Sequence, residues 1–142
     1  MFVKQLTVFI ENRVGSLEEV TESLKENDIN IFSISLADTS EYGLLRMIVS
    51  NPIEGKKVLQ ENGFSAMLTD VIAVRLENRV GTLSNLFKTI SAAGIGIEYM
   101  YAMATAKTGA MILKTSDGVK TIQTLQDTRM TLLDENTMYH LQ

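Results

Sequence analysis

The heptapeptide ENRVGSL at residues 11–17 recurs almost unchanged as ENRVGTL at residues 77–83. The two copies are 77 − 11 = 66 residues apart, in a chain of 142 residues. Repetition at a fixed spacing is the signature of a duplicated structural unit. The sequence therefore predicts one unit in residues 1–70 and a second unit in residues 71–142.

Similarity between the halves extends to the segments around the heptapeptide. Residues 6–10 and 72–76 carry an aliphatic residue at every second position, which is typical of a half-buried β-strand. Residues 17–24 and 83–90 carry apolar residues at steps of three and four, which places them on one face of a helix. Each heptapeptide thus connects a predicted strand to a predicted helix.

Two further strands are predicted after this helix in each half. Residues 29–49 and 95–115 each read as a hairpin, with turns at residues 38–41 and 106–109. A second helix and a closing strand then complete each half.

The predicted helices have recognisable ends. The first helix of each half is expected to end near Asn27 or at Gly94, residue types that tolerate the backbone of helix C-termini. Pro52 and Asp117 suit the start of the second helix in each half. The first closing strand, at residues 64–69, runs into the next half without a Gly, Pro or Ser-rich spacer, so we expect rigidly packed units.

Each half therefore reads as βαββαβ, which predicts an α+β fold of two ferredoxin-like units packed side by side. Each unit is expected to have an antiparallel sheet with both helices on one face. This fold serves many functions, so the repeated loop has to indicate the function.

The repeated loop combines groups that suit a zwitterion. Gly15 and Gly81 permit backbone geometries that a Cβ would obstruct, and each lies just before a predicted helix. The first amides of a helix have no intrahelical partner and favour a carboxylate. Asn12 and Asn78 add an amide that donates to a carboxylate and accepts from an ammonium group. A free amino acid carries both groups.

Over its whole length the sequence resembles tandem ACT-domain proteins, a family of small regulatory modules that bind amino acids. The family motif is Asn, two residues, Gly, a small or aliphatic residue, and Leu. The matching residues are Asn12, Arg13, Val14, Gly15, Ser16 and Leu17, and then Asn78, Arg79, Val80, Gly81, Thr82 and Leu83.

The loop also resembles the serine-sensing ACT domain of phosphoglycerate dehydrogenase. A second asparagine opens the next strand in that domain, and Asn30, followed by Ile31, matches it. A histidine that the domain places two residues before the loop asparagine is replaced here by Ile10 and Leu76. Serine is therefore not assigned as the ligand.

The resemblance implies that each ligand lies between the loop of one unit and the strand start of the other. One crevice would then join the Asn78 loop to Asn30, and the other would join the Asn12 loop to Gly96. Only the first crevice keeps both amides. In the second crevice, Glu98 is either a partner for the ligand ammonium or a solvated carboxylate on the strand face.

The two helix starts differ in charge. Ser16 and Glu19 fit a capping box, which with Glu18 places two carboxylates at the positive end of the first helix. The corresponding start at residues 82–85 has no acid. We therefore expect one strong site per chain, at the second loop.

Other function classes find little support in the composition. The chain has no cysteine and one histidine, lacks a P-loop, and has no metal-ligand spacing, so we expect no catalytic residues, no metal and no cofactor. Glu11 and Glu77 lie two residues from Arg13 and Arg79, which predicts surface ion pairs rather than catalytic bases.

The charge distribution argues against nucleic acid as a partner. The net charge is −4, with 6 basic against 11 acidic residues in residues 1–70 and 7 against 6 in residues 71–142. No basic cluster is available to neutralise phosphates. No stretch approaches the roughly 20 apolar residues of a membrane span, and neither an export signal nor cysteine appears, so the expected location is the cytoplasm.

The sequence thus predicts a non-catalytic protein that senses a free amino acid and regulates an enzyme or process of amino-acid metabolism in trans. A homodimer is expected. The alternative is a protein-interaction module, or a regulatory subunit of a partner enzyme, that acts without a ligand.

Overall fold

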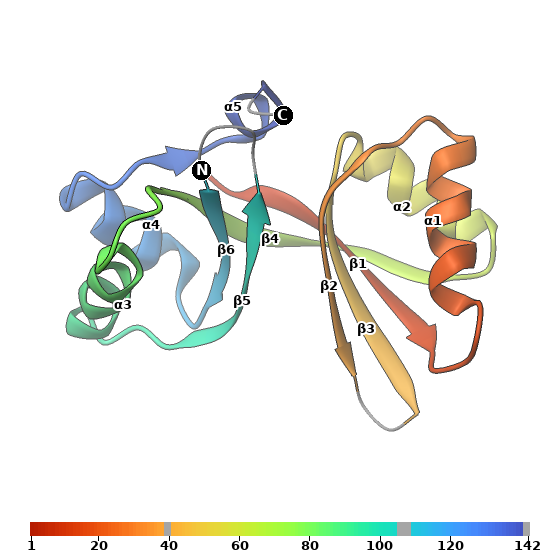
Figure 1. Ribbon diagram of the computed structural model, residues 1–142, viewed down its shortest axis with the longest axis horizontal. Coiled ribbons are helices and arrows are strands. Elements are labelled where there is room, and N and C mark those ends of the chain that lie inside the picture. Colours follow the sequence, from red (N-terminus) through yellow and green to blue (C-terminus); the bar gives the residue numbers. More distant parts are fainter. Residues whose placement is uncertain (39–40, 105–108, 141–142) are drawn as a thin grey trace. The chain divides into compact units, whose positions relative to one another are not determined.

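The computed structural model describes residues 1–38, 41–104 and 109–140. The chain divides into two compact units, which are drawn as ribbons in Figure 1. The first unit is Lys4–Thr69, and the second unit is Asp70–Gln142 together with Met1–Val3. The tips of both predicted hairpin turns, residues 39–40 and 106–108, lie outside the described residues.

The first unit has the predicted βαββαβ order. Its elements are β1 (Val3–Glu11), α1 (Ser16–Glu26), β2 (Ile31–Asp38), β3 (Tyr42–Val49), α2 (Pro52–Glu61) and the start of β4 (Ser65–Leu76). The strand order is β2–β3–β1–β4, with antiparallel β2·β3 and β1·β3 pairs. The hydroxyls of Thr7 and Thr69 hydrogen-bond at 3.0 Å between β1 and β4. This is the strand order of a ferredoxin-like sheet, as predicted.

The second unit repeats this order. Its elements are the rest of β4, α3 (Thr82–Ala92), β5 (Ile97–Ala104), β6 (Gly109–Thr115), α4 (Gly118–Asp127), β7 (Leu132–Leu133) and α5 (Glu135–His140). The strand order is β5–β6–β4–β7, and the pairs are antiparallel. The predicted closing strand of this half has only two residues, and α5, which follows it, was not predicted.

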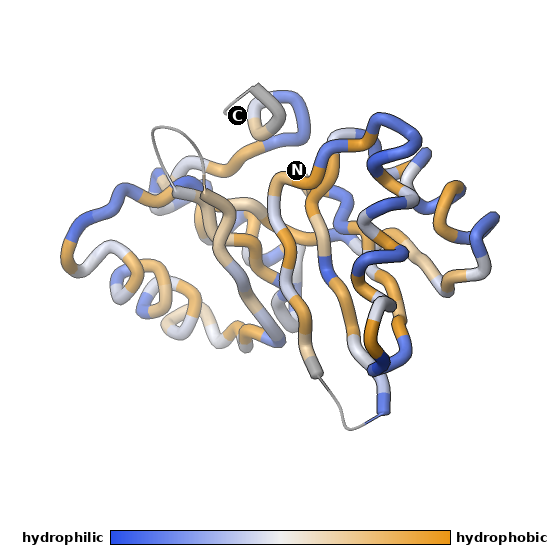
Figure 2. Tube along the Cα trace, turned by 45° about the vertical axis from the view of Figure 1, so that its right-hand side comes forward, coloured by the Kyte–Doolittle hydropathy of each residue, from blue (hydrophilic) through white to orange (hydrophobic). Residues whose placement is uncertain are grey.

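One face of each sheet is covered by two helices. In the first unit the alternating residues Leu6, Val8 and Ile10 of β1 pack with Val20 and Leu24 of α1 in one buried cluster. In Figure 1, α1 and α2 lie on the same side of β1 and β3. Hydrophobic and hydrophilic residues alternate along the helices (Figure 2), as expected when only one side of a helix is buried. The predicted alternation is confirmed for the residues that face the helices, but Thr7 and Ala73 on the other face are buried too, so these strands are not half-buried along their whole length.

The second unit has an equivalent core. Ile72 and Val74 of β4 pack with Leu86 and Ile90 of α3, and α4 adds Leu125. These residues occupy the same pattern positions as their counterparts in the first unit. The repeat in the sequence is therefore a repeat in the packing.

Most predicted helix ends are confirmed. Asn27 is the C-cap of α1, and Gly94 follows α3 with a φ of 75°. Pro52 opens α2 behind Asn51, whose side chain accepts from the amide of Glu54 at 3.2 Å. None of the described helices is long and apolar enough to cross a membrane.

A cap on α4 gives a test of this local structure. The carboxylate of Asp117 accepts a hydrogen bond from the amide of Lys120 at 3.0 Å. Because the cap satisfies an otherwise unpaired amide, Asp117→Ala should lower the free energy of unfolding by about 1 kcal/mol in urea denaturation. Asp127→Ala, at the opposite end of α4, should change stability by less than about 0.5 kcal/mol. Equal losses in the two variants would contradict the capping role.

Candidate functional site

The two repeated loops have the same backbone geometry. Gly15 has φ 93° and ψ −11°, and Gly81 has φ 91° and ψ −12°. The amide of Glu19 donates to the Gly15 carbonyl at 3.0 Å. Likewise, the amide of Asn85 donates to the Gly81 carbonyl at 2.9 Å. The left-handed glycine is therefore the N-cap of its helix in both units, and the predicted need for glycine is confirmed.

The predicted capping box at Ser16 and Glu19 is wrong. Because Gly15 takes the N-cap position, Ser16 becomes the first helical residue, and no side chain caps α1. The Ser16 side chain is 3% exposed, and its hydroxyl has no hydrogen-bond partner within the described chain. Thr82, its counterpart, donates its hydroxyl to the Arg79 carbonyl at 3.1 Å.

In the first loop, Arg13 is fixed by two carboxylates. Its Nη1 and Nη2 donate to the two carboxylate oxygens of Glu19 at 3.2 and 3.0 Å, and its Nε donates to Glu11 at 3.3 Å. The hydrogen bonds to Glu19, and then its charge, raise the pKa of the Arg13 guanidinium above its ordinary value. The predicted ion pair with Glu11 is confirmed, but the bidentate pair with Glu19 was not predicted.

The second loop lacks this bidentate connection. Arg79 pairs with Glu77 at 2.6 Å, which confirms the other predicted ion pair. Asn85 stands where the first unit has Glu19, so the first turn of α3 has no acidic residue. The two loops share a backbone but differ in electrostatics, because α1 carries two acids in its first turn and α3 carries none.

A serine hydrogen-bonds to the residue that precedes β2, and another to the residue that precedes β5; neither serine was singled out in the sequence. The Ser50 hydroxyl accepts from the amide of Asn30 at 2.9 Å, and the Ser116 hydroxyl accepts from the amide of Gly96 at 3.0 Å. The serine amides donate back to the carbonyls of Asn30 and Gly96, each at 2.9 Å. Ser50 and Ser116 are 66 residues apart, which is the spacing of the repeat, so the sequence could have indicated that they have the same role. Ser50 therefore bonds to the main chain of Asn30, and Asn30 itself is exposed.

Both loops present apolar side chains to solvent. Val14 and Val80 are 101% and 106% exposed, and Leu17 and Leu83 are each 39% exposed. Isolated exposed apolar residues are common, but here the same two positions are exposed in both units. The loop tip and the helix start therefore expose the same apolar side chains in both units.

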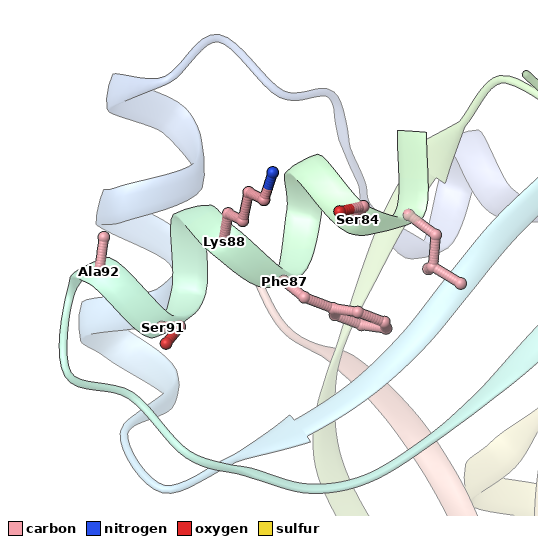
Figure 3. Close-up of a pocket in the computed structure, with 6 residues that line it drawn as sticks. Ser84, Phe87, Lys88, Ser91 and Ala92 are labelled. Atoms are coloured by element: carbon pink, nitrogen blue, oxygen red, sulfur yellow. The ribbon is translucent and has the colours of Figure 1, made fainter. Parts of the chain in front are cut away.

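A shallow pocket of about 660 Å³ lies along the outer side of α3, starting next to the second loop. It is lined by Leu83, Ser84, Phe87, Lys88, Ser91 and Ala92. Figure 3 shows that these side chains all come from this helix, with Phe87 and Lys88 pointing in different directions. The pocket combines apolar groups with hydroxyls and one cation.

The same side of α1 is acidic. Glu18 and Glu22 occupy the positions that Ser84 and Lys88 have in α3, and they line grooves on the surface of α1. The duplicated helices have thus diverged in charge on this side. A ligand carboxylate would meet repulsion at α1 but not at α3.

Of the remaining predicted site residues, Asn30 and Ile31 line a groove with Ile29 and the end of α1. Glu98 is exposed on β5, where the register with β6 is irregular. Among the described residues, no group of three His, Cys, Asp or Glu side chains is placed to hold a metal ion. The pairing of each loop with a strand start stays a prediction.

Comparison with known proteins gives a family for the whole chain. A family model described as an ACT domain pair matches residues 1–142. The crystal structure of protein BT0572 from Bacteroides thetaiotaomicron is 36% identical, with a TM-score of 0.93, and the match covers 98% of this chain and 96% of that chain. A comparison with curated proteins gives no significant match.

More distant structures share the fold. The regulatory subunit of aspartate kinase from Thermus thermophilus, in its ligand-free form, is 16% identical with a TM-score of 0.62, over 87% of this chain and 91% of that chain. The corresponding subunit from Thermus flavus is 18% identical with a TM-score of 0.60, over 87% and 90% of the chains.

The left-handed glycine can be tested against a matched position. A Cβ added to Gly81 would meet nothing within 4 Å, so Gly81→Ala should lose about 1–2 kcal/mol of stability from backbone strain alone. In Gly96→Ala, the new Cβ would lie 3.8 Å from the Ser116 hydroxyl, at a backbone conformation open to alanine. Thermal unfolding of both variants should therefore show a loss only for Gly81→Ala. A loss of similar size in both would show that space, and not φ, decides the residue.

Proposed function

Because this chain belongs to the ACT domain pair family, we propose that it binds a free amino acid and regulates a partner enzyme or process of amino-acid metabolism in trans. The protein has no catalytic role of its own in this proposal, and no metal or cofactor takes part. The absence of cysteine fits a reducing cytoplasm as its location.

The second loop is the proposed principal site. The observation that carries this choice is the start of α3, which has no acid in its first turn and continues into the apolar pocket at Leu83 and Phe87. The first amides of the helix would hold the ligand carboxylate. Asn78 would bind the carboxylate or the ammonium group, and the pocket would receive an apolar side chain.

The proposed contacts of this site are Asn78, Arg79, Val80, Gly81, Thr82 and Leu83, together with Asn30 and Ile31. The first loop is proposed as the weaker site, with Asn12, Val14, Gly15, Ser16, Leu17 and Glu98. The acids at the start of α1 support this order, because they repel a carboxylate.

Regulation follows if the ligand prefers one state of the protein over another. Binding then shifts the equilibrium between free and partner-bound or assembled states. A homodimer is the proposed assembly. Its support is the edge strand β2 of the first unit, where Ile34 and Leu36 are 45% and 50% exposed. A module that binds a partner without any ligand is the second candidate, supported by the exposed valines at the loop tips.

A thermal-unfolding screen against each of the twenty amino acids tests the ligand. An amino acid present at 100 times its dissociation constant adds about 2.7 kcal/mol, which should raise the melting temperature by several degrees. We expect one responder or a chemically related set. Absence of any shift at 10 mM would contradict amino-acid sensing by the free chain and favour the ligand-independent module.

Paired asparagine variants test the choice of loop. Asn78→Ala should weaken binding of the responding amino acid about tenfold, because it removes a hydrogen bond to a charged group. Asn12→Ala is the matched control in the first loop and should have a smaller effect in isothermal titration calorimetry. Equal losses, or two equal sites per chain, would contradict the second loop as the principal site.

A further inference from the structure

A separate pocket lies within the first unit, at the end of β1 and the start of α1. Its volume is about 350 Å³, and all of its lining residues belong to the first unit. Phe64 provides aromatic surface, and the polar side chains of the lining are Glu11, Arg13, Ser16, Glu19, Asn62 and Ser65. A concave pocket in which polar groups converge beside an apolar side chain is a candidate small-molecule site.

Ser16 gives this pocket an unused polar group. The residue is 3% exposed, it lines the pocket, and no group in the described chain hydrogen-bonds to its hydroxyl. Burying a hydroxyl without a partner costs free energy. Thr82 at the same position of the second unit avoids this cost by donating to the Arg79 carbonyl. An external acceptor would satisfy Ser16.

Arg13 in the same pocket already binds a carboxylate. Its two terminal nitrogens hold the two oxygens of Glu19 at 3.0 and 3.2 Å, which is the fork geometry by which arginine binds carboxylate ligands. Glu19 also lines the pocket. The carboxylate of Glu19 thus occupies the place that a ligand carboxylate would take on Arg13.

We propose that the first unit contains a second ligand site, for a carboxylate carried on a small aromatic or aliphatic body, and that Glu19 is its built-in occupant. The ligand carboxylate replaces Glu19 on Arg13 and accepts a hydrogen bond from the Ser16 hydroxyl. Its apolar body lies against Phe64. This site differs from the proposed principal site, because its residues come from one unit and its anion partner is a guanidinium; it shares Ser16 with the weaker site proposed for the first loop.

The strength of the internal pair makes replacement feasible. The side chains of Arg13 and Glu19 are 49% and 51% exposed, so the pair is solvated. Ion pairs of this kind contribute little to stability and exchange readily with competing ions. Glu19 therefore sets a threshold concentration for the ligand and does not seal the site. The second unit has Asn85 at this position and no such competitor.

The test is an NMR titration with 3-phenylpropionate that follows the backbone amides of Ser16 and Gly63, which line the pocket. In Glu19→Gln the probe should bind up to about fivefold more tightly than in the unchanged protein, because the internal competitor is lost. Glu18→Gln is the matched control, since Glu18 is a first-turn acid that does not line this pocket. It should tighten binding less than Glu19→Gln does, because Glu18 repels a carboxylate from the helix start but does not occupy Arg13.

A second substitution tests the hydroxyl. Adding Ser16→Ala to Glu19→Gln should weaken the probe about tenfold, because a hydrogen bond to a charged group is lost. The uncharged 3-phenylpropanol should bind more weakly than the acid in Glu19→Gln. Well-dispersed spectra of each variant show that it is folded.

Several results would overturn the second site. They are an absence of shifts at Ser16 and Gly63 in Glu19→Gln, equal tightening in Glu18→Gln, equal binding of the alcohol, or no effect of Ser16→Ala. Shifts confined to Gly81 and Leu83 would also overturn it. That last result would leave the proposed function intact, because those amides belong to the second loop.

Discussion

The left-handed glycine at the start of the first helix is the constraint on which each unit depends. With φ near 90° at Gly15 and Gly81, the chain turns from the first strand into the helix without a side-chain cap. The helix therefore begins one residue earlier than a serine cap would place it, and its first amide, that of Ser16 or Thr82, donates to the carbonyl of Arg13 or Arg79 at 3.3 Å. In both units the exposed valine lies just before this glycine and the partly exposed leucine lies two residues after it.

Duplication kept the backbone and changed the charges. The same turn carries Glu19 in the first unit and Asn85 in the second, and the same outer helix side carries Glu22 or Lys88. Such changes at exposed positions alter stability little but alter which ions approach the helix start. One loop holds its arginine with an internal carboxylate, and the other leaves its helix start free of acid. The two units thus share one backbone and differ in the charges at the start of their first helix.

Periodicity in the sequence was sufficient to predict the strands and helices from β1 to α4 and their order, because burial on one face imposes a regular pattern. The capping box was predicted because Ser16 and Glu19 have the right spacing. The prediction was wrong because Gly15, in its left-handed conformation, is the N-cap. The helix α5 was missed because it is short; only Asp134, which accepts from the amide of Thr137 at 2.7 Å, marks its start. The Arg13–Glu19 pair depends on a side-chain direction that spacing alone does not determine.

The serine hydroxyls at the strand starts have an evolutionary consequence. Ser50 and Ser116 bind the main chain of the residue before β2 or β5, so the fold places no demand on the side chain there. Asparagine and glycine have both been accepted at this position, in Asn30 and Gly96. A position that is structurally neutral yet fixed in space can change without loss of folding. Descendants of a duplicated gene could therefore acquire different preferences at these two residues while the scaffold stays the same.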